Sequence, residues 1–308
     1  TRPRTRMPDI DNPAFLELVS LGIGDPVRME PFHPRTRDKP IPVHRDSESG
    51  LLVLERFERP EDYYAADKPP DRDETMQYSI TELASGASLK TRTLDDQQRR
   101  FEMFRDRLAG KSVCDYGAGF GGFIRRAAQV AGRCAGVELR AHCHAYAAEN
   151  FPDIPFVADI EALDDHFDII TMFHVLEHLP GALETLRRLR ARLNPDGHLI
   201  IEVPHAKDFL IQSVEIPEFR DFTFWSEHLV LHTQDTLCGL LQAAGFSDVR
   251  VWHEQRYGFT NHLNWFLNRK PGGHDALGNL EDPLLEAQYR ESRERDGTSD
   301  TLMAEARV

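Results

Sequence analysis

A glycine-rich turn followed by two carboxylates is the first pattern in the sequence whose residue types could do chemistry. Segment 115–119 reads Asp-Tyr-Gly-Ala-Gly after an apolar run, and Glu138 stands 23 residues after Asp115. Glycines allow the positive φ angles and the close backbone approach that a ligand lying across the turn requires. A carboxylate such as Glu138 suits the two ribose hydroxyls of an adenosyl group. Asp159 and Ile160 follow later, where an acid and an apolar side chain would suit the adenine.

Two further segments combine imidazoles with carboxylates. His174, Glu177 and His178 follow an apolar run at i, i+3 and i+4, a spacing that would place them on one face of a helix. Segment 225–228 reads Trp-Ser-Glu-His and precedes another helical pattern. We expect His228 to be functional, because a charged Glu-His pair before an apolar run needs a reason. The Glu177-His178 pair serves equally well to cap and orient a helix.

The elements that must position these residues alternate between strand and helix. Strands are predicted at 112–115, 134–138, 155–158, 167–172, 198–203, 248–257 and 300–307, and helices at 95–108, 120–131, 141–149, 181–193 and 234–244. This alternation favours a doubly wound α/β sheet covered on both faces. In such sheets ligands bind beyond the carboxyl ends of the strands. Residues 258–299 are predicted to be an insertion before the last strand.

The chain before this pattern has a different character. Residues 1–93 are predicted to form an N-terminal arm and a small β subdomain or lid, with two short strands between residues 41 and 56 around a turn at Ser49-Gly50. Residues 57–93 are polar and are interpreted as a linker or lid. Residues 94–308 are predicted to form the cofactor-binding domain.

Composition limits the possible partners. The chain has 308 residues and a net charge of −14, with 51 acidic and 37 basic residues. This balance disfavours a nucleic-acid substrate, whose enzymes usually carry a basic face. No apolar run approaches the about 18 residues of a membrane span. The four cysteines stand singly, which argues against disulfides and zinc ribbons and favours the cytoplasm.

The order and spacing of these motifs resemble class I S-adenosylmethionine-dependent methyltransferases. The resemblance rests on segment 115–119, Glu138, Asp159 and segment 173–180 (Phe-His-Val-Leu-Glu-His-Leu-Pro), and covers about 95–257 plus the last strand. A dinucleotide fingerprint, Gly-x-Gly-x-x-Gly, fits less well because an Asp leads here. The resemblance implies a seven-stranded, mostly parallel, Rossmann-like sheet with an antiparallel last strand. It also implies S-adenosylmethionine as the cofactor.

The same resemblance implies roles for individual residues. The methionine moiety would lie along Gly117 and Gly119 with its amino group near Asp115, while Glu138 would hold the ribose and Asp159 and Ile160 the adenine. The cofactor-binding residues expected on this basis are Asp115, Gly117, Gly119, Phe120, Glu138, Leu139, Asp159, Ile160, Phe173 and His174.

Segment 225–228 is also similar to the Tyr-His-Glu-His-Leu segment of C-methyltransferases that act on nucleotide-linked deoxysugars. This similarity implies catalytic roles for Glu227 and His228, and places His178 where that family has an active-site His. Our hypothesis is that His228, oriented by Glu227, is the general base, with His178 as the alternative. We expect a small polar acceptor, a sugar or sugar nucleotide, contacted by polar and aromatic residues of the insertion: Arg256, Asn261, His262, Trp265 and Lys270.

Two other interpretations remain open. Glu177, His178 and His228 are similar to the magnesium-binding residues of small-RNA 2′-O-methyltransferases, but His174 replaces a Glu of that family. The carboxylate oxygen that magnesium would need is therefore absent at this position, and we expect no bound metal ion. A catalytically silent cofactor-binding protein is the other alternative. The sequence also resembles a degenerate zinc-ribbon loop at residues 45–50. The acceptor atom and the oligomeric state stay open.

Overall fold

The computed structural model describes residues 9–58 and 96–308, which divide into two compact units. Unit 1 comprises 9–58, 173–191 and 199–308, and unit 2 comprises 96–172 and 192–198. The predicted boundary between residues 93 and 94 lies outside the described residues, as does most of the predicted linker or lid.

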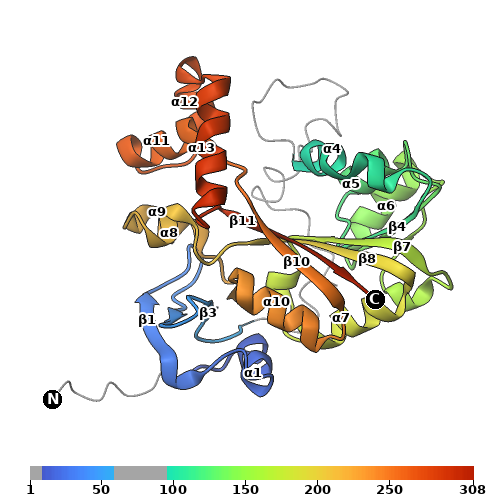
Figure 1. Cartoon of the computed structure of the whole chain (residues 1–308), viewed down its shortest axis with the longest axis horizontal. Helices are drawn as coiled ribbons and strands as arrows, with labels where there is room; N and C mark the ends of the chain where they lie inside the picture. Colours follow the sequence, from blue (N-terminus) through green and yellow to red (C-terminus); the bar gives the residue numbers. More distant parts are fainter. Residues whose placement is uncertain (1–8, 59–95) are drawn as a thin grey trace. The chain divides into compact units, whose positions relative to one another are not determined.

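A seven-stranded sheet has the strand order β10-β11-β8-β7-β4-β5-β6. The strands are β4 (Ser112–Tyr116), β5 (Arg133–Val137), β6 (Phe156–Val157), β7 (Phe167–Phe173), β8 (Leu193–Pro204), β10 (Ser247–Glu254) and β11 (Thr301–Arg307). Strand β4 pairs in parallel with β5 and β7, and β5 pairs in parallel with β6. Strand β11 is antiparallel to β10 (Figure 1). The predicted α/β fold with an antiparallel last strand is confirmed.

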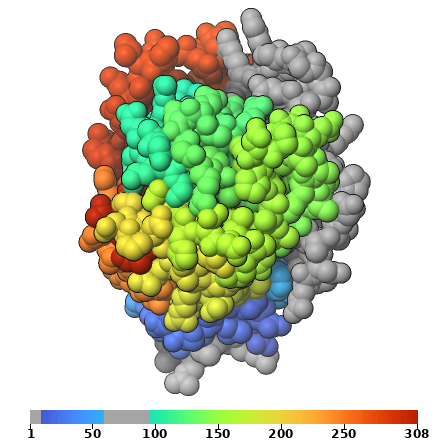
Figure 2. All heavy atoms as spheres, turned by 90° about the vertical axis from the view of Figure 1, so that its right-hand side faces the viewer, coloured from blue at the N-terminus to red at the C-terminus, as the bar shows by residue number. Residues whose placement is uncertain are grey.

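The described residues of unit 2 contain three α-helices, α4 (Asp96–Leu108), α5 (Gly122–Ala127) and α6 (Ala141–Asn150), and the 3₁₀ helix η2 (Ile160–Ala162). Helix α5 packs against α4, β4 and β5, and α6 packs against β6. Figure 2 shows a face of the molecule where side chains of these helices, coloured teal to green, form much of the surface. The predicted start of α5 at Phe120 is wrong. Gly121, at φ 76°, still belongs to the turn, so the helix begins at Gly122.

Unit 1 contains the helices that follow β7, β8 and β10. They are η3 (Leu176–His178), α7 (Ala182–Ala191), α8 (Phe209–Gln212), α9 (Pro217–Thr223), α10 (Gln234–Ala243), α11 (Phe259–Asn268), α12 (Gly273–Ala276), η4 (Gly278–Leu280) and α13 (Pro283–Arg295). Helix α10 packs against α7, β10 and β11, and α11 packs against α12 and α13 (Figure 1). The predicted insertion 258–299 is therefore mostly helical. Within the described ranges, no helix has the length and apolar character needed to cross a membrane.

A second, antiparallel sheet lies within unit 1, in the order β1-β2-β3-β9. Its strands are β1 (Met29–His33), β2 (Val43–Asp46), β3 (Leu52–Leu54) and β9 (Val230–Leu231), and α1 (Pro13–Ser20) and η1 (Pro26–Arg28) precede it. The two strands predicted around Ser49-Gly50 are β2 and β3. Strand β9 was not predicted, and it begins two residues after His228. In the β2–β3 turn, the Asp46 carboxylate accepts bonds from the Glu48 and Ser49 amides and pairs with Arg28.

Candidate active site

Segment 115–119, which comprises the last two residues of β4 and the turn after it, is fixed to the end of β5. We call it the cofactor turn. The amides of Gly117 and Ala118 donate to the carbonyl of Val137 at 2.8 and 2.9 Å. The Gly119 amide donates to Oε2 of Glu138 at 2.9 Å. Gly117 and Gly119 have φ angles of 80° and 54°, in the left-handed region that glycine tolerates best. The glycines are therefore required by the backbone path of the turn.

Glu138 is a buried carboxylate already supplied with hydrogen bonds. Besides the Gly119 bond, its Oε1 accepts from the amide and Nε of Arg140 at 3.0 Å, and Oε2 accepts from the same guanidinium at 3.2 Å. Burial acts to raise the pKa of Glu138, but the hydrogen bonds and charge of Arg140 outweigh it and lower the pKa. An ionised carboxylate is a strong acceptor for hydroxyl donors. Ribose hydroxyls bound here would replace the guanidinium bonds.

Asp115 is the second buried acid of unit 2. Its side chain accepts a 2.7 Å hydrogen bond from the hydroxyl of Thr171 on β7. Burial raises the pKa of Asp115 to about 6, against the opposing effects of the Thr171 hydroxyl and Arg100. A cationic amino group placed against this carboxyl would favour its ionised form. Asp115 is thus suited to a ligand that brings its own positive charge.

The remaining cofactor residues predicted in unit 2 have varied environments. Asp159 is exposed and comes two residues after β6 ends, where its side chain caps the 3₁₀ helix η2 (Ile160–Ala162) by accepting from the Glu161 amide. Ile160 is only 1% exposed, whereas Leu139 is 55% exposed. Phe120 packs on His142 and Tyr146 of α6. Strand β6 ends at Val157, one residue before the end of the predicted strand 155–158, so Asp159 does not directly follow a strand.

In unit 1, His174 bridges two buried carboxylates. Its Nδ1 lies 3.2 Å from Oε1 of Glu177, and its Nε2 lies 3.0 Å from Oε1 of Glu202. Burial acts to lower the pKa of His174, but the two carboxylates outweigh it and raise the pKa. Phe173, the last residue of β7, is also buried. The prediction that His174, Glu177 and His178 share one helical face was wrong: His174 has φ 53° and lies before the 3₁₀ helix Leu176–His178.

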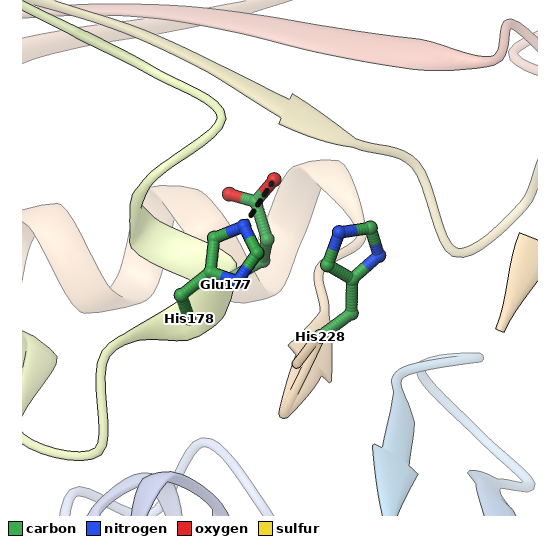
Figure 3. Close-up of side chains that lie close together, drawn as sticks. All are labelled: Glu177, His178 and His228. Atoms are coloured by element: carbon green, nitrogen blue, oxygen red, sulfur yellow. Dashed lines mark ion pairs between the residues drawn. The ribbon is translucent and has the colours of Figure 1, made fainter. Parts of the chain in front are cut away.

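Glu177, His178 and His228 converge in unit 1, and we call them the histidine cluster (Figure 3). One ligand atom from each lies within 4.8 Å of the others. Nε2 of His178 is 3.9 Å from Oε1 of Glu177, and the two imidazole rings are 4.9 Å apart. Burial acts to raise the pKa of Glu177, but the His174 hydrogen bond and nearby imidazoles lower it to about 2. Burial, then His178, lowers the pKa of His228 to about 3.

Glu227 lies near His178. Its Oε2 is 3.9 Å from Nδ1 of His178. Glu227 is buried, and His228 is half-buried. The orientation of His228 by Glu227 remains a prediction.

Residues of the N-terminal arm contact segment 225–228. This contact was not predicted from the sequence. Asp38 accepts hydrogen bonds from the amide and hydroxyl of Ser226. The Arg37 guanidinium lies over the Trp225 ring at 4.5 Å, and that ring is 5.6 Å from the His228 ring. Arg37 and Asp38 belong to a stretch without periodicity, 188 residues before Ser226. The sequence therefore gave no local signal for this contact.

The polar residues of the insertion are mostly internal. Arg256 pairs with Asp300 at 3.2 Å, and its guanidinium lies 3.3 Å from Nε2 of His174. Three of the predicted acceptor residues are buried: Asn261, His262 and Trp265. His262 bonds to the hydroxyl of Tyr289, and Trp265 packs on Phe219 and Phe222. Lys270 is exposed.

Several solved methyltransferase structures are similar to the chain. A SAM-dependent methyltransferase from Archaeoglobus fulgidus is 17% identical, with a TM-score of 0.49, over 75% of this chain and 99% of that chain. One from Mesorhizobium loti is 20% identical, with a TM-score of 0.44, over 68% and 97%. Coclaurine N-methyltransferase bound to N-methylheliamine and SAH is 17% identical, with a TM-score of 0.44, over 70% and 73%. No curated protein matches.

A family model described as a methyltransferase domain matches residues 91–251, which is more than half of the chain. The match includes the cofactor turn, Glu138 and the histidine cluster. The chain belongs to this methyltransferase-domain family, and it is an enzyme that uses S-adenosylmethionine.

Proposed function

We propose that this enzyme methylates a small polar acceptor, most readily a sugar or sugar nucleotide. The observation that carries the proposal is the convergence of two imidazoles and a buried carboxylate beside Trp225 and Arg37. An aromatic ring with a guanidinium and imidazoles suits a small molecule that has hydroxyls and negative charge. The similarity of segment 225–228 to the deoxysugar C-methyltransferases supports the same acceptor class.

The cofactor assignment within unit 2 is part of this proposal. The buried carboxyl of Asp115 takes the amino group of S-adenosylmethionine, and the backbone at Gly117 and Gly119 lies along its methionine moiety. Glu138 takes the ribose hydroxyls, because its ionised carboxylate can exchange guanidinium bonds for hydroxyl bonds. Asp159 and Ile160 take the adenine. Phe120 and Leu139 complete the proposed set in unit 2. The other two residues predicted from the sequence, Phe173 and His174, belong to unit 1.

Methyl transfer requires the acceptor atom to attack the methyl carbon while the carbon–sulfur bond breaks and its electron pair passes to sulfur. Much of the rate comes from aligning the two reactants. An oxygen or carbon acceptor must also lose a proton. We propose that the histidine cluster prepares the acceptor for this loss. His228 as general base is the simplest version, although a pKa of about 3 makes its imidazole a weak base at neutral pH.

The net charge of −14 supports a small acceptor over a polynucleotide. A cytoplasmic location belongs to the same proposal and is supported by four free thiols. The test is a screen for S-adenosylhomocysteine release with nucleotide sugars, simple glycans, polyketide hydroxyls and short RNAs. We expect release with the sugar compounds and only mild weakening by added salt. Activity confined to RNA, falling steeply with salt, would favour the RNA 2′-O-methyltransferase alternative. Cofactor binding without release of S-adenosylhomocysteine from any acceptor would favour the other alternative, a catalytically silent cofactor-binding protein.

A further inference from the structure

We infer that Glu177, His178 and His228 form a binding site for a divalent transition-metal ion of the zinc type. The inference rests on the proposed function, because the bound ion would hold and activate the acceptor oxygen. It begins from the geometry in Figure 3, where side chains from two distant segments point toward one another. Glu177 and His178 belong to the turn after β7, while His228 stands just before β9.

The spacing of the side chains is close to what an ion needs. Their candidate ligand atoms all lie within 4.8 Å of one another. Ligand atoms around a tetrahedral zinc ion, bound at about 2.0–2.1 Å, are separated by roughly 3.4 Å. Small side-chain rotations would close this difference.

An unsatisfied oxygen supplies the second, independent observation. Oε2 of Glu177 is buried and has no hydrogen-bond partner among the described residues. The other oxygen, Oε1, is the one that His174 bonds. A buried carboxylate oxygen without a partner destabilises the folded state, because it has given up its hydrogen bonds to water. Coordination of a cation by Oε2 would satisfy this oxygen.

Neighbouring side chains fix the orientation of Glu177 and His178, as residues just behind a metal's ligands commonly do. His174 connects Glu177 to the buried Glu202, and this chain of hydrogen bonds fixes the Glu177 carboxylate. On the other side of His178, Oε2 of Glu227 lies 3.9 Å from Nδ1, while Nε2 is directed toward Glu177. Metal-bound imidazoles in proteins commonly have such a carboxylate behind the non-ligating nitrogen.

The donor types select the class of ion. Two imidazoles and one carboxylate are the ligand set of several catalytic zinc sites, which keep a fourth position open. Magnesium prefers a shell of oxygen ligands and is disfavoured by two nitrogen donors. His174 does not enter the shell as a hard ligand, because its ring nitrogens already face Glu177 and Glu202. The site therefore fits Zn²⁺ or a similar first-row ion.

The open position narrows the proposed acceptor to a hydroxyl. A coordinated hydroxyl has a lowered pKa, as zinc-bound water does, and releases its proton to solvent. The resulting alkoxide attacks the methyl carbon, the carbon–sulfur bond breaks, and the electron pair goes to sulfur. The products are a methyl ether and S-adenosylhomocysteine. His228 would act here as a ligand.

The test is calorimetric titration of Zn²⁺ into chelator-stripped protein, repeated with Co²⁺ while visible absorption is recorded. We expect about one equivalent of Zn²⁺ per chain and the visible bands of four-coordinate Co²⁺. Glu177→Gln, which keeps the side-chain shape, and His228→Ala should each weaken binding at least roughly a hundredfold. His253→Ala, which changes a half-buried histidine of unit 1 outside the cluster, should bind as the unmodified protein does.

Two outcomes would overturn the inference: no stoichiometric binding by the unmodified protein, or equal binding by Glu177→Gln and His253→Ala. S-adenosylmethionine affinity measured on the same samples shows that each variant is folded. Methyl transfer by stripped protein separates the two proposals. Full activity without bound metal would reject the proposed role of the ion in activating the acceptor but would keep the methyltransferase assignment. Zinc binding with no transfer to any sugar would keep the site and reject the acceptor.

Discussion

The cofactor turn and the histidine cluster are built in opposite ways. The cofactor turn is local: Asp115, two glycines and Glu138 span only a short stretch of chain, and backbone bonds between β4 and β5 hold them together. The histidine cluster is assembled from the turn after β7 and the segment before β9, with Asp38 and Glu202 as distant supports. Changes in the turn should therefore act on cofactor binding, and changes in the cluster on methyl transfer.

The largest expected effect is in the turn. In Gly119→Val, a β-branched side chain must adopt the φ of 54° that Gly119 has, where L-residues are strained, and it would fill space beside the cofactor. We expect S-adenosylmethionine binding to fall below detection in calorimetry. Gly110→Val changes another positive-φ glycine of unit 2, away from the cofactor turn, and controls for loss of folding. Unchanged affinity in Gly119→Val would reject the cofactor assignment.

The next effect is in the cluster. His228→Ala should lower turnover by on the order of a hundredfold, whether His228 is a base or a ligand, and should leave cofactor affinity nearly unchanged. Single-turnover release of S-adenosylhomocysteine measures it. His178→Ala is the companion variant, and a larger loss there would make His178 the principal group. If turnover survives in both variants, alignment alone drives the reaction.

A smaller, pH-dependent effect is expected at Asp115. The ionised carboxyl binds the cofactor's amino group, so affinity should be constant above the pKa of about 6 and fall below it. The expected decline approaches about tenfold per pH unit below pH 6, because the ionised fraction of the carboxyl falls about tenfold with each unit. Calorimetry from pH 5 to pH 8 tests this, with Asp115→Asn as the variant that should be weak but insensitive to pH. A flat profile in the unmodified protein would contradict the role of Asp115.

The smallest effect concerns Arg140, whose guanidinium bonds occupy Glu138. Arg140→Ala removes this guanidinium. We expect cofactor binding to strengthen by roughly threefold, because the ribose hydroxyls no longer compete with the guanidinium for the Glu138 carboxylate. Arg133→Ala removes an exposed ion pair with Asp165 in the same unit and should have no effect. A loss of affinity in Arg140→Ala would mean that the arginine supports the bound state.

The same contrast explains what the sequence could predict. The alternation of strands and helices and the cofactor turn were predictable, because apolar runs, glycines and the two acids Asp115 and Glu138 are close together in the chain. The start of α5 was not, because Gly121 extends the turn by its own positive φ. Helix boundaries depend on such single backbone angles.

The supports of the cluster were hidden for different reasons. Glu202 stands in the apolar run of β8, where it is fully buried and reads as part of a core strand. Asp38 lies in a stretch with no periodicity, and only the folded chain brings it to Ser226. The left-handed φ of His174 removes it from the helix that its spacing predicted. Long-range contacts of this kind leave no local pattern.

The most direct test of the division between the two regions is calorimetric titration of S-adenosylmethionine into two variants, each lacking one buried glutamate. Glu138→Ala removes the carboxylate of the cofactor turn, and Glu227→Ala removes the one beside His178. We predict an affinity loss of at least roughly a hundredfold in Glu138→Ala, since charge-assisted hydrogen bonds are lost, and almost none in Glu227→Ala. Unchanged affinity in Glu138→Ala, or an equal loss in both variants, would contradict the account.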